Sequence, residues 1–281
     1  MTSTSSAPPQ WWEVAGLATA WPAVENLAVG PWTARASDGF TYWANSVLVP
    51  SPPPLSSDAS PVLVPSPEEL IGAVEAFYAA RRLPGRFRLC GPVGDLGEEG
   101  LVTALLGRGY RHRLEAEGQI WGSELRPLRA SAPAERFGRV RIASEPTEDW
   151  LQRWWAWLGR PDSERSGAME LLSMLERHVG FAAHVNGADV LALAIGVVQG
   201  PWLELHDLLP ALPDPGTSIG DSAAGAQGSA RRVISALATW GIAHAARWAH
   251  TEVPSVQTAT AALLEGIGFR PLAQVSYLEQ G

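Results

Sequence analysis

The sequence contains no lysine, and its 21 basic residues are all arginine, so the chain offers no side-chain amine. A single cysteine, Cys90, excludes an internal disulfide and a zinc site built from cysteines. No apolar run is long enough to predict a membrane-spanning helix. Residues 1–10 lack the basic and apolar regions of a signal peptide, so we interpret them as a flexible tail. These absences predict a cytoplasmic protein with no membrane partner.

Acidic residues outnumber basic ones by 29 to 21, which gives a formal net charge of −8 at pH 7. A negatively charged chain repels the phosphates of nucleic acids and attracts cations. His184, His244 and His250 are scattered and do not have the spacing of metal ligands. We therefore expect no nucleic-acid partner and no metal, and we favour a cationic, amine-bearing substrate. The sequence leaves homodimer formation open.

The length of 281 residues and the hydrophobic content of 46% predict a globular protein with one large domain or two of average size. A junction rich in proline and alanine spans residues 126–135. We place an N-terminal domain at 11–127 and a C-terminal domain at 134–281. Strand and helix patterns occur in both halves, so the sequence predicts the α+β class.

In the first half, Asp38-Gly39 is a strong signal for a hairpin turn. Ser66 is predicted to cap a helix that begins at Pro67, because acidic residues occupy the first turn. The expected elements are helices at 11–20, 67–82 and 100–108, strands at 32–36, 40–49 and 86–90, a long strand or hairpin at 110–125, and a proline-rich loop at 50–66.

In the second half, Thr147 is predicted to cap a helix with Trp150, Trp154 and Trp157 on one face. Such a stripe packs into a core or stacks on a cationic substrate, and we favour packing. Asn186-Gly187 fits a tight turn between two strands. The expected elements are strands at 138–143, 181–185, 190–198 and 202–209, and helices at 148–158 and 166–178.

Residues 202–240 predict a strand, a turn of small residues and a helix. Apolar residues at helical spacing predict that this helix begins near Gly228, just after Gly225. The first amides of a helix have no intrahelical partner, so they can bind a phosphate. Taken alone, these residues are equally typical of an ordinary junction between a loop and a helix.

Three runs then follow in order, namely Gly228–Arg231, Trp240–Val253 and Gly268–Arg270. Their order resembles the GNAT superfamily of acyl-CoA-dependent N-acetyltransferases. In the first half, Ala44–Leu48 and Phe77–Phe87 are similar to runs in tandem members of that superfamily. The resemblance implies an α/β/α arrangement of two GNAT-like domains, each with a mixed, mostly antiparallel, twisted sheet flanked by helices. It also implies that the first domain is degenerate and lacks a phosphate loop, and an unrelated α+β domain is the alternative there.

The resemblance implies that acetyl-CoA is the co-substrate and that an amine, on a small molecule or a peptide, attacks it directly. Glu204 matches the position of the family's catalytic base, and His206 on the same strand face could share this role. A solvated strand glutamate and a structural histidine are the alternatives, and Asp207 is interpreted as structural. The cofactor-binding residues implied by the family are Leu208, Leu209, Gln227, Gly228, Ser229, Ala230, Arg231 and Gln257.

Several positions depart from the family pattern. Gly225 replaces a basic residue or glutamine, Pro210 has no amide hydrogen, and Leu264 occupies the position of the family's general-acid tyrosine. The segment before Gly225 is also longer than usual. These departures leave open a catalytically impaired GNAT-like protein that acts as a binding or scaffolding module. A third alternative is an enzyme that uses a longer acyl-CoA.

Overall fold

The computed structural model describes residues 10–15, 21–50, 66–95, 99–130, 138–175, 178–210 and 219–281. Contacts divide the chain into two compact units. Unit 1 comprises Met1–Ile120, Pro254–Val256 and Pro271–Gly281, and unit 2 comprises Trp121–Val253 and Gln257–Arg270. Both units combine helices with a mixed set of strands, as the α+β prediction requires. The last strand belongs to unit 1, although it follows unit 2 in the sequence.

The sheet of unit 2 places its strands in the order β11-β10-β9-β8-β7. Its strands are β7 (Arg139–Ala143), β8 (Val179–Asn186), β9 (Asp189–Gln199), β10 (Trp202–Pro210) and β11 (Trp248–Pro254). Strands β7 to β10 form antiparallel pairs, whereas β10 and β11 are parallel. The predicted meander is therefore confirmed, and a helical crossover must join the parallel pair.

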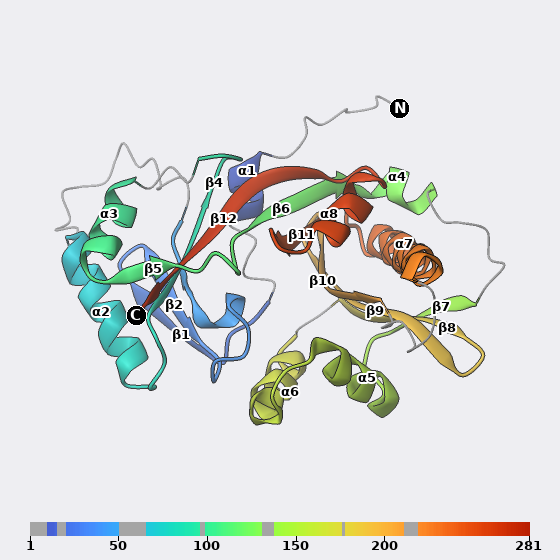
Figure 1. Cartoon of the computed structure of the whole chain (residues 1–281), viewed down its shortest axis with the longest axis horizontal. Coiled ribbons are helices and arrows are strands. Elements are labelled where there is room, and N and C mark those ends of the chain that lie inside the picture. The colour runs from blue at the N-terminus through green and yellow to red at the C-terminus, as the bar shows by residue number, and fades with distance from the viewer. Residues whose placement is uncertain are drawn as a thin grey trace. The chain divides into compact units, whose positions relative to one another are not determined.

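Helices cover both faces of this sheet (Figure 1). Helix α7 (Ile219–Ala243) packs on one face, while α5 (Glu148–Leu158) and α6 (Arg165–Ser173) lie on the other. Two shorter helices complete the unit, α4 (Leu125–Ala130) and α8 (Thr258–Glu265). The apolar stripe of α7 and the small residues of β8 and β9 form one core, which includes Val233, Leu237, Ala182, Ala192 and Ala194.

Small strand residues let α7 approach the sheet closely. A Cβ atom on Gly196 of β9 would lie 2.9 Å from the Cδ2 atom of Leu237 and 3.1 Å from the Cδ1 atom of Leu203. A larger residue at this position would require the side chains of Leu237 and Leu203 to move. The packing that holds α7 against the central strands of unit 2 thus depends on a glycine in the sheet.

The sheet of unit 1 follows the order β1-β2-β3-β4-β12, with β5 (Tyr110–His112) also paired to β12. Its strands are β1 (Glu25–Val29), β2 (Trp32–Ala36), β3 (Val47–Leu48), β4 (Arg86–Gly91) and β12 (Arg270–Gln280), and β6 (Gly118–Glu124) spans the border between the units along the chain. Strands β1 to β3 are antiparallel, and β3 and β4 are parallel.

The helices of unit 1 are α1 (Trp11–Ala15), α2 (Pro67–Ala79) and α3 (Glu99–Gly107). The predicted cap of α2 is confirmed, because Ser66 Oγ accepts from the Glu69 amide while Glu69 Oε2 accepts from the Ser66 amide. Helices α2 and α3 bury Ile71, Val74 and Leu105 in the core of this unit. Of the tail predicted at 1–10 and the loop predicted at 50–66, residues 1–9 and 51–65 lie outside the described residues.

The predicted strand at 40–49 is wrong. Only Val47–Leu48 is a strand, and a 3₁₀ turn, η1 (Trp43–Asn45), precedes it. The buried side chain of Asn45 explains this, since its Oδ1 accepts from the amides of Ser37 and Gly39 and its Nδ2 donates to the carbonyls of Phe40 and Thr41. These bonds satisfy backbone groups that a strand would pair with a neighbour.

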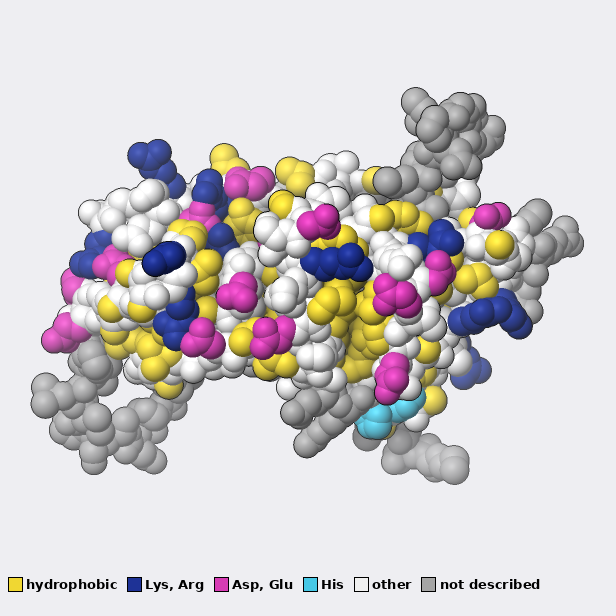
Figure 2. Space-filling model, turned by 90° about the horizontal axis from the view of Figure 1, so that it is seen from below, with side chains coloured by type: hydrophobic (Ala, Val, Ile, Leu, Met, Phe, Trp, Pro, Cys, Tyr) yellow, Lys and Arg dark blue, Asp and Glu magenta, His cyan; other side chains and the backbone are white. Residues whose placement is uncertain are grey.

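The surface in Figure 2 carries acidic and arginine side chains that are interspersed, without one continuous basic field on that face. Within the described part of the chain, no helix is long and apolar enough to cross a membrane. The same residues contain no group of three or more His, Cys, Asp or Glu side chains able to hold a metal ion.

Candidate functional site

Strand β10 brings together the two predicted catalytic residues. Glu204 Oε1 lies 3.3 Å from His206 Nε2, and both side chains are largely buried, with 13% and 6% of their surface exposed. The two residues are one pleat apart, so the period of the strand places them on one face as predicted. A carboxylate and an imidazole in contact can hold and transfer a proton.

Three carboxylates act on His206. Burial is the strongest single influence and lowers the pKa of His206, but Glu204, Asp207 and Glu252 together outweigh it and raise that pKa above its ordinary value. The imidazolium form is therefore more favoured than in an isolated histidine. A positively charged His206 attracts and orients the Glu204 carboxylate, which makes His206 a positioning residue for it.

Asp207 lies at an irregularity in β10. The pairing with β9 shifts register between His206 and Leu209, and Asp207 has φ +48°, in the left-handed region. The indole Nε1 of Trp154 donates a hydrogen bond of 2.9 Å to Asp207 Oδ2. Burial raises the pKa of Asp207, against the opposing effects of His206, this hydrogen bond and Arg160. The structural role expected for Asp207 agrees with this anchoring.

Strands β10 and β11 are paired only at their beginnings. The parallel register runs from Trp202–Trp248 to Glu204–His250, although β10 continues to Pro210 and β11 to Pro254. Beyond Glu204 the backbone groups of the two strands no longer bond to each other. Such groups are available to an extended ligand chain that carries amides.

The predicted backbone contacts Leu208 and Leu209 lie on this part of β10, beyond the last pair with β11. Both side chains are half-buried, and Leu208 packs against the core of unit 2. Glu204 lies in the last residue pair between β10 and β11, opposite His250. The strand therefore presents a carboxylate at the point where its pairing with β11 ends.

The predicted start of the next helix is wrong. Helix α7 begins at Ile219, so Gly225 and Gly228 lie inside it and residues 227–231 belong to its third and fourth turns. In an α-helix only the first four amides lack an intrahelical acceptor. Residues 219–226 are mostly small, which is typical of a flexible turn. Because alanine favours a helix and glycine disfavours it, this composition does not show where the helix begins.

The remaining predicted cofactor residues are spread over two helices. Ser229 and Ala230 are buried against the core, while Gln227 and Gln257 are exposed. The guanidinium Nη2 of Arg231 lies 3.2 Å from the point where a Cβ of Gly266 would stand, at the C-terminal end of α8. The predicted cofactor residues beyond β10 therefore lie within α7 and at the start of α8.

Unit 2 contains no tyrosine at all, since the four tyrosines of the chain are Tyr42, Tyr78, Tyr110 and Tyr277, which all belong to unit 1. Leu264, at the family's tyrosine position, is fully buried in the core. No phenol within unit 2 can therefore act as a general acid.

The tryptophan side chains on one face of α5 pack inside the protein, which is the alternative that the sequence analysis favoured. Trp150 and Trp154 are buried and stacked at 5.9 Å, and Trp150 Nε1 donates to the carbonyl of Ala182. The third buried indole is Trp155, which bonds to Asp162, whereas Trp157 is half-buried. The helical spacing therefore identified the packed face of α5 correctly, but the third buried indole is Trp155 and not Trp157.

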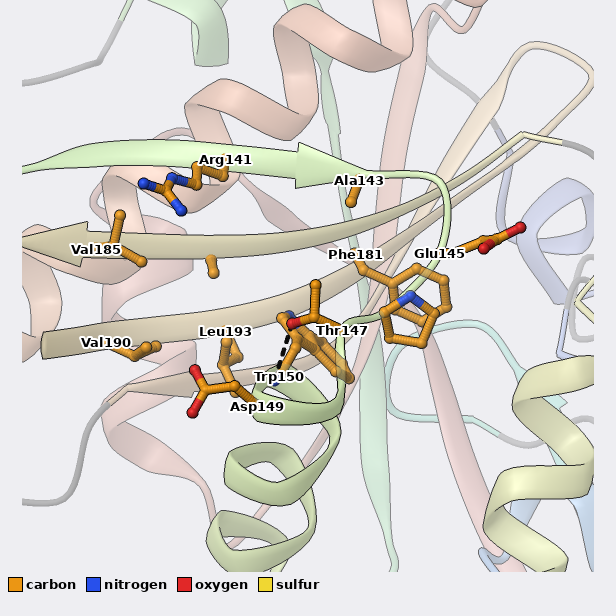
Figure 3. A pocket seen from close by; sticks show the side chains of 12 residues that line it. Arg141, Ala143, Glu145, Thr147, Asp149, Trp150, Phe181, Val185, Val190 and Leu193 are labelled. Atoms are coloured by element: carbon orange, nitrogen blue, oxygen red, sulfur yellow. Dashed lines mark hydrogen bonds between the residues drawn. The ribbon is translucent and has the colours of Figure 1, made fainter. Parts of the chain in front are cut away.

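A small cavity of about 150 Å³ lies where β7, β8 and β9 meet the N-terminal turn of α5 (Figure 3). Its apolar wall consists of Trp150, Phe181, Val185, Val190 and Leu193. None of the predicted site residues lines it. Sequence reasoning missed this cavity because its walls come from four elements whose pairing no local pattern reveals.

Glu252 is a carboxylate near the candidate site that the sequence analysis passed over. It lies on β11 and contributes to the raised pKa of His206, on the neighbouring strand. His250, to which no chemistry was assigned, is buried with its ring 5.5 Å from that of Trp202. Only the pairing of β10 with β11 connects these residues, and the sequence does not encode that register locally.

Comparisons with solved structures identify the fold. A GCN5-related N-acetyltransferase from Kribbella flavida has a TM-score of 0.64 at 14% identity, covering 98% of this chain and 96% of that chain. A tandem GNAT protein from the clavulanic acid biosynthesis pathway has a TM-score of 0.57 at 13% identity, covering 76% and 70%. A functionally unknown conserved protein from Staphylococcus epidermidis ATCC 12228 has a TM-score of 0.56 at 8% identity, covering 90% and 92%.

No curated protein matches the chain. Residues 12–278, which are nearly the whole sequence, match the family described as "Probable histone acetyltransferase Rv0428c C-terminal". The resemblance inferred from the order of elements is thus confirmed, and the chain belongs to this family of GNAT-fold, acetyltransferase-like proteins.

Proposed function

We propose that this protein transfers an acetyl group from acetyl-CoA to an amine by direct attack, with unit 2 carrying the reaction. The observation that supports it is the Glu204 carboxylate at the separation of β10 and β11, in contact with buried His206. The extended backbone beyond this point suits the amide-containing pantetheine arm of the donor. A family that uses acetyl-CoA makes this ligand the natural candidate.

In the proposed reaction the amine nitrogen forms a bond to the thioester carbonyl carbon, and the carbon–sulfur bond breaks. Glu204 takes the proton that the amine loses. The sulfur leaves with the bonding electron pair as a thiolate, which water protonates, since unit 2 supplies no tyrosine. No enzyme-bound acyl intermediate is needed, because the single cysteine lies in unit 1.

The acceptor in this proposal is a cationic amine. The family description names a histone acetyltransferase, whose substrate is a basic protein. A net charge of −8 attracts such a substrate electrostatically. Unit 1, like unit 2, follows an antiparallel run with one parallel strand pair, so we also propose that it is a second, degenerate GNAT-like unit.

The Glu204→Gln variant tests the role of the base. We expect kcat/KM to fall by about 10²–10⁴-fold and the rise of the pH–rate profile on its acidic side to disappear. Glu252→Gln removes one carboxylate from the neighbouring strand and serves as the matched control, with a loss below about tenfold. An unchanged pH–rate profile in Glu204→Gln removes this residue from the mechanism.

A second candidate function is a catalytically impaired GNAT-like module that binds without catalysing transfer. Two observations favour it, namely the absence of tyrosine from unit 2 and the start of α7 before Gly225. Calorimetry with acetyl-CoA, followed by transfer assays on a panel of amines, separates the two functions. Binding without transfer to any amine supports the module, whereas turnover supports the enzyme.

A further inference from the structure

Two histidines that are far apart in the sequence meet at the C-terminal end of α7. His178 directly precedes β8, and His244 directly follows α7. Their ring centroids lie 4.7 Å apart, with an angle of 49° between the ring planes. His178 is exposed and His244 is half-buried, so solvent reaches the pair. The sequence predicted no metal from the spacing of histidines along the chain, and that spacing does not show this contact.

The backbone on both sides of the contact is fixed by the core of unit 2. The amide of Val198 on β9 donates a hydrogen bond of 2.9 Å to the carbonyl of His178. Two residues further on, Gly180 lies so close to α7 that a Cβ there would stand 3.3 Å from the Cε2 atom of Trp240. The amide of His244 donates to the carbonyl of Trp240, in the last turn of the same helix. The sheet and the helix therefore set the distance between the two histidines.

The ring of His244 is held in one tautomer. Its Nδ1 atom lies 2.8 Å from the carbonyl oxygen of Trp240, and because a carbonyl can only accept, Nδ1 carries the hydrogen. The neutral ring then has a lone pair on Nε2. The indole of Trp240 packs against the imidazole, with ring centroids 4.5 Å apart, and restricts its rotation. Histidines that bind metals are oriented in this way, by an N–H bond from one ring nitrogen to a carbonyl or a carboxylate.

The ring of His178 is able to turn toward a shared ion. Within the part of the chain that the structure describes, its side chain makes no hydrogen bond or ion pair, and it touches the ring of His244. Two imidazole nitrogens at about 2.0–2.1 Å from one ion, at coordination angles of about 90–110°, place the ring centroids about 4.5–5.2 Å apart. The observed 4.7 Å lies in this range. Binding one ion therefore needs a rotation of the His178 side chain and no movement of the backbone.

The surroundings of the pair favour a cation. The contact lies at the C-terminus of α7, where the helix dipole is negative. Among the described residues, no further His, Cys, Asp or Glu joins the two histidines in a group of three or more. Imidazole nitrogens are ligands that Zn²⁺, Ni²⁺ and Cu²⁺ prefer, whereas Ca²⁺ and Mg²⁺ prefer oxygen. This ligand set fits an open, exchangeable site and not a closed structural one.

We infer that His178 and His244 together bind a divalent late transition-metal ion of the class of Zn²⁺, Ni²⁺ and Cu²⁺. His244 supplies Nε2, His178 supplies one ring nitrogen, and water occupies the other coordination positions. The bound ion links the end of α7 to the start of β8. This inference does not rest on the proposed function, because neither histidine takes part in it.

Calorimetry of the full, untagged chain with Ni²⁺ is the direct test, and we expect one ion to bind. His178→Ala and His244→Asn should each weaken Kd by about tenfold or more, since each removes one of the two ligands. Asparagine places its amide nitrogen near the position of Nδ1, so His244→Asn keeps the donor to Trp240 and loses Nε2. His112→Ala removes another partly exposed histidine, serves as the control, and should change Kd by less than about twofold.

Thermal unfolding separates the loss of a ligand from the loss of the fold. Without metal, His178→Ala should keep its Tm within about 2 °C of wild type, because the side chain is exposed. Ni²⁺ at about ten times the wild-type Kd should raise the Tm of wild type more than that of His178→Ala. No binding to wild type, or equal binding by the variants, would overturn the inference. Loss of Ni²⁺ binding in His206→Gln but not in His178→Ala would place the ion on β10 and overturn it too.

Discussion

Both units join two parallel strands through a helix, yet they differ in what the first strand carries. In unit 1, β3 has two residues and leads to α2, whose first turn is closed by the Ser66 and Glu69 capping box. In unit 2, β10 has nine residues, continues beyond its pairing with β11, and carries Glu204, His206 and Asp207. The candidate site in unit 2 lies where the two parallel strands stop pairing although both continue.

The buried carboxylates of the two units also differ, because their partners are of different kinds. In unit 1, Arg86 and Arg113 both bind Glu279. Burial raises the pKa of Glu279, but the two guanidinium groups outweigh it and lower that pKa below its ordinary value. Glu204 in unit 2 has an imidazole partner instead, and despite burial the neighbouring carboxylates raise the pKa of that partner, His206. The two arginines keep the Glu279 carboxylate ionised. A histidine can itself gain or lose a proton, so Glu204 and His206 can exchange one.

The largest expected effects come from the two cores. Ile71→Ala in α2 and Leu237→Ala in α7 each remove a fully buried side chain, and each should lower the free energy of unfolding by about 2–5 kcal/mol. Urea unfolding followed by tryptophan fluorescence measures both. Leu106→Ala, at a half-exposed position of α3, is the control and should cost less than about 1 kcal/mol. Ile71→Ala should leave acetyl-CoA affinity unchanged, and a large loss of affinity would contradict the division of roles.

A smaller effect is expected from Glu279→Gln, which leaves Arg86 and Arg113 without their shared counter-charge. We expect a loss of about 2–4 kcal/mol at neutral pH. Because folding lowers the pKa of Glu279, its stabilisation is complete above the unfolded pKa of about 4.3 and is lost as pH falls through the folded pKa.

The difference between wild type and this variant should therefore shrink as unfolding is measured at successively lower pH below about 4. Glu115→Gln, which is exposed and close to Arg113, is the control and should cost less than about 0.5 kcal/mol. A gap between wild type and Glu279→Gln that stays constant down to acidic pH would show that charge is not the cause.

The smallest effect should come from Asp207→Asn. Folding raises the pKa of Asp207, so this residue favours the folded state below its unfolded pKa of about 3.9 and loses that contribution as pH rises through the folded pKa. Asparagine still accepts from Trp154 and tolerates a positive φ. We expect stability at neutral pH to rise on the order of 0.5 kcal/mol and the His206 titration followed by NMR to move to lower pH. A less stable variant at neutral pH would refute this reading, and Asp207→Ala, which loses the acceptor, serves as the comparison.

Much of the fold followed from local pattern. The meander of β8, β9 and β10, the caps at Ser66 and Thr147, and the packed face of α5 were all predicted from spacing and turn residues. The errors occur where side chains override propensity, as at Asn45, or where weak helix formers continue a helix, as at Gly225. The contact of Glu204 with His206 was predictable because it lies within one strand.

The sequence by itself determined the α+β class, the order of elements that identifies the family, and the shared face of Glu204 and His206, because each depends on residues close together in the chain. Tertiary structure alone decided where α7 begins, that β10 and β11 separate after Glu204, and that Trp154 and Glu252 act on the residues of β10. The separation of the strands and the contacts of β10 depend on segments far apart in the sequence, and no local pattern encodes the register in which such segments meet.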